Sequence, residues 1–330
     1  MIKKFTFKDW REEKMIRFFA YLALSLFTMA AAQTSDLGQE VDPAYVTCDM
    51  RGGLGNQFFE IATTLAHAWD HGAIPIFPDL HGDRWKMNEH LQSVFFRIDA
   101  SSSPRPFSAF YDDPSWCSTR KIPFERDQKI YGYFQIWKRF NHYRDKILQL
   151  FAPSEEVVGD LNKKYGELLS HPNTVSVHVR TANLSKHQGL IHYFVGMEYY
   201  QKAMDLFPPD ALFVVFSDRI NWCKKHFPKL GKNCVFVEGN DEVHDFYLMS
   251  MMKHHIIPNS TFSWWASYMN QNPGKVTIVP ESWQHPDLFA YPMVQPNDFY
   301  MPDWTIVVPN YYEPYPSDMI DYDPPPWDGN

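Results

Sequence analysis

The chain has 330 residues, of which 45% are hydrophobic and 21% are charged. This composition excludes an intrinsically disordered protein, because such chains lack the apolar surface that offsets conformational entropy. The length suits two domains or one large one. Thirty-one basic residues against thirty-nine acidic ones give a net charge of −8, which argues against non-specific nucleic-acid binding but leaves room for a local basic pocket for a phosphorylated small molecule.

The N-terminus combines a basic front with an apolar run at residues 18–32 that ends in three alanines. The run suits a cleavable secretory signal, especially if synthesis starts at Met15. It also suits a signal anchor, although it is shorter than the roughly 20 residues of a full bilayer span, and a buried core helix is the third alternative. The polar linker at 34–42 favours a membrane signal followed by a short stem.

The pattern becomes globular at residue 44. Residues 44–50 predict a strand, 51–57 a tight glycine-rich loop, 58–72 a helix with apolar residues every three or four positions, and 73–77 a second strand. No element is assigned with certainty in 78–130, which is rich in Pro, Ser and Asp. Order returns at 129–135 and continues in a helical stretch at 140–150.

A second alternating series follows Pro153, which marks the predicted boundary between two domains. Strands are expected at 175–179, 212–216, 235–237, 255–257 and 276–279, and helices at 199–206, 221–226, 242–253 and 262–270. Strands that alternate with helices predict parallel α/β layers in both halves. From residue 309 the chain is a proline-rich, acidic tail.

The glycine-rich loop matches neither common nucleotide fingerprint. Position 58, where a dinucleotide turn has its third glycine, is Phe, and no Gly-Lys-Ser/Thr follows. Gly55 at a strand–helix junction still lets backbone amides approach an anion, and Asn56 and Gln57 add side-chain donors. A purely structural tight turn is the alternative.

Two polar residues stand at the end of the strand at 175–179. His178 and Arg180 are alternate residues, so they project from one face, at the strand end where ligands collect in open α/β sheets. Arg180 offers a planar fork to a diphosphate, and a surface arginine after a buried strand is the alternative. Both residues are candidate catalytic residues.

Two further strands end in capping residues. Asn259, Ser260 and Thr261 lie between an apolar strand and a helix that opens at Phe262, where free amides and hydroxyls form an anion cradle. Ser217 and Asp218 end the neighbouring strand, where a carboxylate accepts hydrogen bonds from a ribose or a base. Ordinary helix capping is the alternative for both sets.

Metal and disulfide chemistry find little support in the sequence. The histidines at 178, 187 and 192 lack a carboxylate partner at metal-ligand spacing, so we expect no metal site. The cysteines at 48, 117, 223 and 234 are too scattered for a disulfide scaffold or a zinc cluster. We expect them to be buried apolar side chains, or to form one or two disulfides if the chain is exported.

In order along residues 46–290, these motifs resemble the α-1,2-fucosyltransferases of glycosyltransferase family 11. The resemblance rests on the following segments: Gly52-Gly53-Leu54-Gly55-Asn56-Gln57-Phe58-Phe59, Gly132-Tyr133-Phe134-Gln135, His178-Val179-Arg180, Phe216-Ser217-Asp218, Phe246-Tyr247-Leu248-Met249-Ser250 and Asn259-Ser260-Thr261-Phe262-Ser263-Trp264-Trp265-Ala266.

The resemblance implies a GT-B-type α/β fold, with two Rossmann-like domains facing each other across a cleft. Residues 44–153 would form the acceptor-side domain, 154–308 the GDP-fucose-binding domain and 309–330 the tail. The implied reaction is the inverting transfer of fucose from GDP-fucose to the 2-hydroxyl of a galactose-terminated glycan, with no required metal or other cofactor. Donor-binding residues would be Gly55, Asn56, Gln57, Arg180, Ser217, Asp218, Asn259, Ser260, Thr261 and Phe262.

The chain departs from the family after Arg180. Relatives typically continue with Arg-Gly-Asp, whereas this chain has Thr181-Ala182-Asn183. The missing arginine predicts a weaker grip on phosphate, and the missing carboxylate leaves the general base unassigned. The alternative is therefore a catalytically reduced relative that binds a nucleotide sugar or a glycan. With GDP-fucose as donor, we expect a type II Golgi membrane protein with a lumenal catalytic domain, or alternatively a secreted or bacterial protein after signal cleavage.

Overall fold

The computed structural model describes residues 42–115, 117–181, 193–284 and 296–310. The described residues from Ala44 onward belong to one compact unit. The segment at 18–32, most of the tail, and the Ala182-Asn183 pair lie outside the described residues. The structure corrects the predicted type II Golgi anchor, since none of the helices it describes has the length and apolar character needed to cross a membrane.

The first half contains a four-stranded sheet in which every neighbouring pair is parallel. The strand order is β2-β1-β4-β3, and the strands are β1 Tyr45–Cys48, β2 Ile74–Pro75, β3 Ala109–Asp112 and β4 Gln128–Tyr131. Its helices are α2 Leu54–Asp70, α3 Met87–Ser93 and α4 Arg144–Leu150, with 3₁₀ turns η1 Pro78–His81, η2 Arg84–Lys86, η3 Trp137–Arg139 and η4 Asn141–Tyr143. Both α3 and β3 lie in the stretch where no element was assigned.

The second half contains a six-stranded parallel sheet in the order β10-β9-β8-β5-β6-β7. Its strands are β5 Thr174–Val179, β6 Leu212–Ser217, β7 Cys234–Phe236, β8 His254–Ile256, β9 Thr277–Pro280 and β10 Thr305–Val307. Its helices are α5 Glu155–Ser170, α6 Met197–Met204, α7 Ile220–His226 with η5 Phe227–Leu230, α8 Glu242–Ser250, α9 Thr261–Met269 and α10 Pro296–Phe299.

Two parallel sheets with intervening helices confirm the expected α/β class. The strands and helices predicted in the second half are all present, within a few residues at their ends. The predicted domain boundary at Pro153 falls between α4 and α5, where Ser154 caps α5 by accepting a hydrogen bond from the Val157 amide. As a boundary between independent domains it stays a prediction.

In each sheet the chain adds strands first on one side and then on the other. We call the position where this direction changes the switch point. In the first sheet this point lies between β1 and β4, and in the second between β5 and β8. Loops diverge there beyond the carboxyl ends of the strands, which is where open α/β sheets bind ligands. The segments that follow these four strands contain Asn56, Gln135, Arg180 and Thr261.

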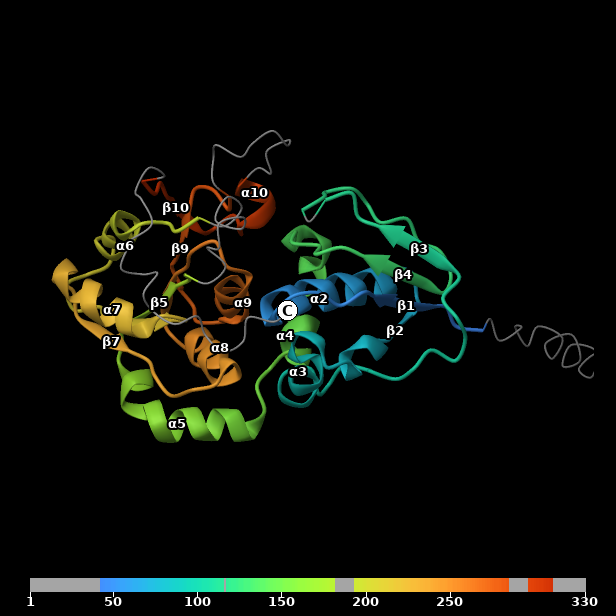
Figure 1. Cartoon of the computed structure of the whole chain (residues 1–330), viewed down its shortest axis with the longest axis horizontal. Coiled ribbons are helices and arrows are strands. Elements are labelled where there is room, and N and C mark those ends of the chain that lie inside the picture. Colours follow the sequence, from blue (N-terminus) through green and yellow to red (C-terminus); the bar gives the residue numbers. More distant parts are fainter. Residues whose placement is uncertain (1–41, 116, 182–192, 285–295, 311–330) are drawn as a thin grey trace, which may run out of the picture. The chain divides into compact units, whose positions relative to one another are not determined.

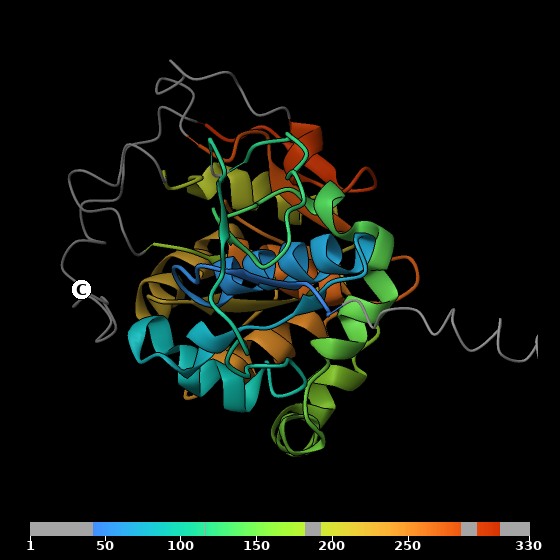
Figure 2. The ribbon, with the colours of Figure 1, turned by 90° about the vertical axis from the view of Figure 1, so that its right-hand side faces the viewer.

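An aromatic core joins the two halves. Trp264 and Trp265 on α9 are fully buried, and the Trp265 ring lies 5.2 Å from the rings of Phe58 and Phe59 on α2 and of Phe140. Figure 1 shows α2 and α9 between the two groups of strands, and Figure 2 shows α2, in blue, beside β1. The tryptophan pair therefore packs the core and holds the N-termini of α2 and α9 in contact.

The glycine-rich loop is shorter than the predicted 51–57. Gly52 has a left-handed φ of +70° that turns the chain, and Gly53 is the extended N-cap of α2. The helix therefore begins at Leu54 instead of residue 58, which places Gly55, Asn56 and Gln57 in its first turn. The amides of Leu54 and Gly55 thus become helix N-terminal donors.

Candidate anion-binding site

The N-termini of α2 and α9 meet at Gly55. A Cβ at this position would lie 2.5 Å from the Phe262 nitrogen and 2.5 Å from both the carbonyl carbon and the Oγ1 of Thr261. Only a residue without a side chain allows this approach of two backbones. Each helix N-terminus carries about half a positive charge, so their contact concentrates positive potential at one point.

Neither helix neutralises its own N-terminus. Gly53 and Ser260, the two N-cap residues, make no side-chain capping bond, and the first turns contain no acidic residue. Within the described chain, the amides of Leu54, Gly55, Thr261, Phe262 and Ser263 have no acceptor. The capping interpretation of Ser260 is therefore not realised, and these amides are candidate donors to an anion.

Asn56 connects the two halves at this point. Its Oδ1 accepts hydrogen bonds from Gln135 Nε2 at 3.0 Å and from Thr261 Oγ1 at 3.1 Å. Its Nδ2 lies over Gly52, where a Cβ would come within 2.3 Å of it. The orientation of the amide is thus fixed by residues from both switch points, and its Nδ2 group has no acceptor among the described residues.

Arg180 and Asp218 face each other across β5 and β6. Arg180 Nη1 lies 3.3 Å from Asp218 Oδ2, and Asp218 Oδ1 accepts hydrogen bonds from the Thr181 amide at 3.0 Å and from Thr181 Oγ1 at 2.7 Å. Ser217 Oγ donates to the Val179 carbonyl at 2.8 Å and accepts from the Arg219 amide. Asp218 and Ser217 therefore hold Arg180 and the end of β5 in place.

His178 is buried beside the N-terminus of α9. Its Nδ1 lies 2.9 Å from Ser263 Oγ, and its ring centre lies 5.7 Å from that of Phe262. Burial, reinforced by the charge of Arg180, lowers the pKa of His178 to about 3. The imidazole is neutral at physiological pH and far from the pKa of an efficient general base, so its geometry favours positioning of α9. Its catalytic role stays a prediction.

Gln57 and Asn259, two residues predicted to bind the donor, use their side-chain amide groups in hydrogen bonds within the protein. Gln57 Nε2 donates to the carbonyls of Gly52 and Trp85, both at 2.9 Å, and its Oε1 lies 2.7 Å from His90 Nδ1. Asn259 Nδ2 donates to the carbonyls of Tyr193 and Trp283. Neither side chain has an amide hydrogen left for a ligand, so both shape the loops that carry the site.

Two residues near this site, Gln135 and Glu242, have no role that was predicted from the sequence. Gln135 belongs to the motif Gly132-Tyr133-Phe134-Gln135, and its hydrogen bond to Asn56 places the end of that motif beside the first turn of α2. Glu242 at the start of α8 lies 3.5 Å from His90 and 3.7 Å from Lys86. Burial alone would raise the pKa of Glu242, but interactions with His90, Lys86 and Arg180 outweigh burial and lower it. No local pattern marks Glu242, since its partners come from distant elements.

The described residues contain neither a cluster of metal ligands nor a disulfide. No group of three or more His, Cys, Asp or Glu side chains there is arranged to hold a metal ion. All four cysteines are described and carry free thiols; Cys48, Cys117 and Cys223 are buried and Cys234 is half-buried. The expectation of buried apolar cysteines is confirmed for the first three.

The family model of glycosyl transferase family 11 matches residues 16–308. The chain belongs to this family. An α-1,2-colitosyltransferase of Escherichia coli is 29% identical over 273 residues, covering 72% of this chain and 92% of the relative. The galactoside α-(1,2)-fucosyltransferase 2 of Gorilla gorilla gorilla is 29% identical over 280 residues and covers 78% of each chain. Fucosyltransferase NodZ from Bradyrhizobium has a TM-score of 0.49 and 16% identity, over 69% of this chain and 93% of that chain.

Proposed function

We propose that this family 11 glycosyltransferase is a galactoside α-1,2-L-fucosyltransferase. It transfers fucose from GDP-fucose to the 2-hydroxyl of a galactose-terminated glycan, with inversion at the sugar carbon. Support comes from the family match and from relatives named α-1,2-fucosyltransferases. The observation that carries the proposal is the contact of two uncapped helix N-termini at Gly55, which suits a diphosphate.

In this reaction the bond between the fucose C1 and the β-phosphate oxygen breaks, and the phosphate keeps the electron pair. The galactose 2-oxygen forms the new bond to C1 from the opposite face and gives up its proton to a base. Preorganised donors stabilise the charge that builds on the leaving diphosphate. We assign this role to Arg180, the first-turn amides of α9 and the Nδ2 group of Asn56.

The proposed mechanism requires no metal, because the arginine and the helix N-termini supply positive charge to the leaving group. Turnover should therefore persist in the presence of a chelator such as EDTA. If the chelator abolished turnover and an added divalent cation restored it, this part of the proposal would be wrong.

The decisive experiment is transfer from GDP-fucose to a panel of β-galactosides, with linkage analysis of the product. We expect an α-1,2 linkage, and Arg180→Ala should lower turnover by about 100-fold or more, as loss of a single preorganised donor does. Lys229→Ala, which removes an exposed cation of α7–η5, is the matched control and should behave as wild type. GDP binding without transfer to any acceptor would instead favour the catalytically reduced relative.

A further inference from the structure

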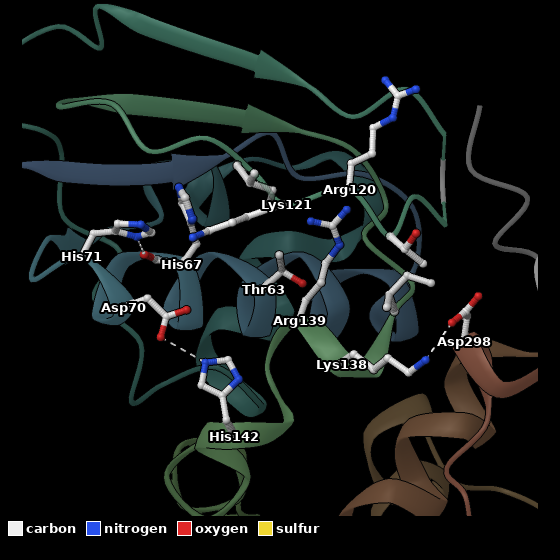
Figure 3. A pocket seen from close by; sticks show the side chains of 13 residues that line it. Thr63, His67, Asp70, His71, Arg120, Lys121, Lys138, Arg139, His142 and Asp298 are labelled. Carbon is white, nitrogen blue, oxygen red and sulfur yellow. Dashed lines mark hydrogen bonds and ion pairs between the residues drawn. The ribbon is translucent and has the colours of Figure 1, made fainter.

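A pocket of about 460 Å³ lies beside the C-terminal part of α2. Its walls come from α2, from the loop at 119–122 and from the segment 136–142, and Asp298 of α10 closes one side. Figure 3 shows the lining side chains, among them Thr63 on α2 and Arg139 on η3. The function proposed above assigns this pocket no role.

The lining carries an excess of positive charge. Its four cations are Arg120, Lys121, Lys138 and Arg139, and its two acids are Asp70 and Asp298.

Both acids already have partners in the lining. Asp298 pairs with Lys138 at 2.8 Å, and Asp70 lies 3.1 Å from His142. The side chains of Arg120 and Lys121 are exposed and have no acidic partner among the described residues. These two cations are therefore available to an anion that enters the pocket.

Two buried polar atoms of the lining lack a hydrogen-bond partner in the described structure. Thr63 is only 1% exposed and its Oγ1 is unsatisfied. The Arg139 side chain is 9% exposed; its Nη2 bonds to Asp113 and to the Ser118 carbonyl, but its Nε has no acceptor. A buried polar group without a hydrogen-bond partner destabilises a protein by about 1–3 kcal/mol. Polar atoms of a bound ligand could form the missing hydrogen bonds with these two side chains.

The pocket and the anion-binding site share α2 and the segment that follows β4. Gln135, which donates to Asn56, directly precedes the segment 136–139 that lines the pocket. On α2, Thr63 lies seven residues beyond Asn56 and therefore about 10 Å along the same helix face. An acceptor whose galactose lies near Asn56 would reach the pocket with its second or third sugar.

We propose that this pocket is an acceptor subsite for an acidic saccharide, meaning a glycan that bears a carboxylate or a sulfate ester one or two sugars away from the reacting galactose. Arg120 and Lys121 bind the anionic group, and Thr63 and Arg139 bind hydroxyl oxygens of the sugar. This inference names the substrate class and rests on the proposed function.

Isothermal titration of the full chain with three galactosides tests the proposal directly. The probes are a neutral oligosaccharide, the same compound with a sulfate ester on its second sugar, and one with a uronic acid there; inorganic sulfate is the fourth titrant. At least one acidic probe should bind about tenfold more tightly than the neutral one, a difference of 1.4 kcal/mol. The difference should shrink at high salt, because salt screens exposed charges.

Substitution identifies the residues responsible. The double variant Arg120→Ala/Lys121→Ala should remove the preference for the acidic probe and leave GDP affinity unchanged. The control Lys163→Ala/Lys229→Ala removes the same charge from exposed positions outside the pocket and should retain the preference.

Equal affinity for acidic and neutral probes overturns the inference, as does a preference that survives the double substitution. Binding of inorganic sulfate as tight as that of the acidic saccharides also overturns it, since the site would then recognise only an ion. These outcomes differ from failure of the proposed function. Transfer to neutral galactosides without an acidic preference leaves the fucosyltransferase intact, whereas charge-dependent saccharide binding without any transfer refutes the enzyme and leaves a saccharide site.

Discussion

Replacing Gly55 by alanine perturbs the anion-binding site at a single atom. The new Cβ would lie 2.5 Å from the Phe262 nitrogen and from two atoms of Thr261, whereas carbon atoms in good contact lie about 3.5–4.0 Å apart. Two of the three atoms belong to the backbone of α9, so no side-chain rotation relieves the clash. The N-termini of α2 and α9 must therefore separate by about 1 Å.

This separation has two measurable costs. Overpacking of a close contact destabilises a protein by about 1–3 kcal/mol, and we expect the free energy of unfolding to fall by this amount. Separation of the two N-termini also weakens their joint field and disturbs the hydrogen bond from Thr261 to Asn56. Since one helix terminus contributes roughly 0.3–1 kcal/mol and up to about 2 kcal/mol when partly buried, GDP affinity should fall about tenfold.

Gly53→Ala is the matched control, two residues away in the same loop. A Cβ at Gly53 meets nothing within 4 Å, and its φ of −72° suits any residue. We expect its stability to stay within about 1 kcal/mol of wild type, because loss of a glycine N-cap and reduced entropy of the unfolded chain largely offset each other. Urea unfolding and titration with GDP provide both readouts. If Gly55→Ala bound GDP as tightly as Gly53→Ala, the two N-termini would not form the diphosphate site.

Two further predictions concern buried side chains. Burial raises the pKa of Glu60 well above 4.5. The folded state therefore keeps the carboxyl protonated at pH values at which the unfolded chain ionises it. As a result, this group lowers the free energy of unfolding as pH rises above 4.5. Glu60→Gln should therefore gain stability relative to wild type between pH 5 and pH 8 in urea unfolding, and a constant difference would refute this assignment. Trp265→Ala should lower the free energy of unfolding by about 3–5 kcal/mol. Trp85 is 40% exposed, so the control Trp85→Ala should lower it by under about 1 kcal/mol. Equal losses of stability in the two variants would contradict the shared aromatic core.

Regular local patterns accounted for most of the elements. The strand β6 is a short apolar run, β5 alternates valine with polar residues, and α2 carries apolar residues at helical spacing, so periodicity located them. The helix α5 was missed because only Val157 and Leu161 are buried in it and its other positions are largely polar. The strand β3 was missed because it lies at a sheet edge, where Phe110 is 63% exposed.

The candidate site was also predicted only in part from the sequence. Its sequence motifs named Gly55, Asn56 and Thr261, which the structure brings together at the N-termini of α2 and α9. That these residues bind the donor together with Arg180 stays a prediction. The motifs gave no means to distinguish Asn56, whose Nδ2 group remains available, from the adjacent Gln57, whose amide hydrogens are both used by carbonyl groups. One of these carbonyls belongs to Gly52, five residues away, but the other belongs to Trp85, 28 residues away, and a local pattern does not contain that partner.

By itself, the sequence determined the α/β class, the order of most elements and the family, and it named candidate segments for the site, because these depend on periodicity and on motifs along the chain. Only the tertiary structure decided that Asn56 meets Thr261 across 205 residues, that two uncapped helix N-termini touch at Gly55, and that a cationic pocket lies farther along α2. Such contacts arise from the packing of α2 on α9, where close approach and burial select which polar atoms pair and which remain for a ligand.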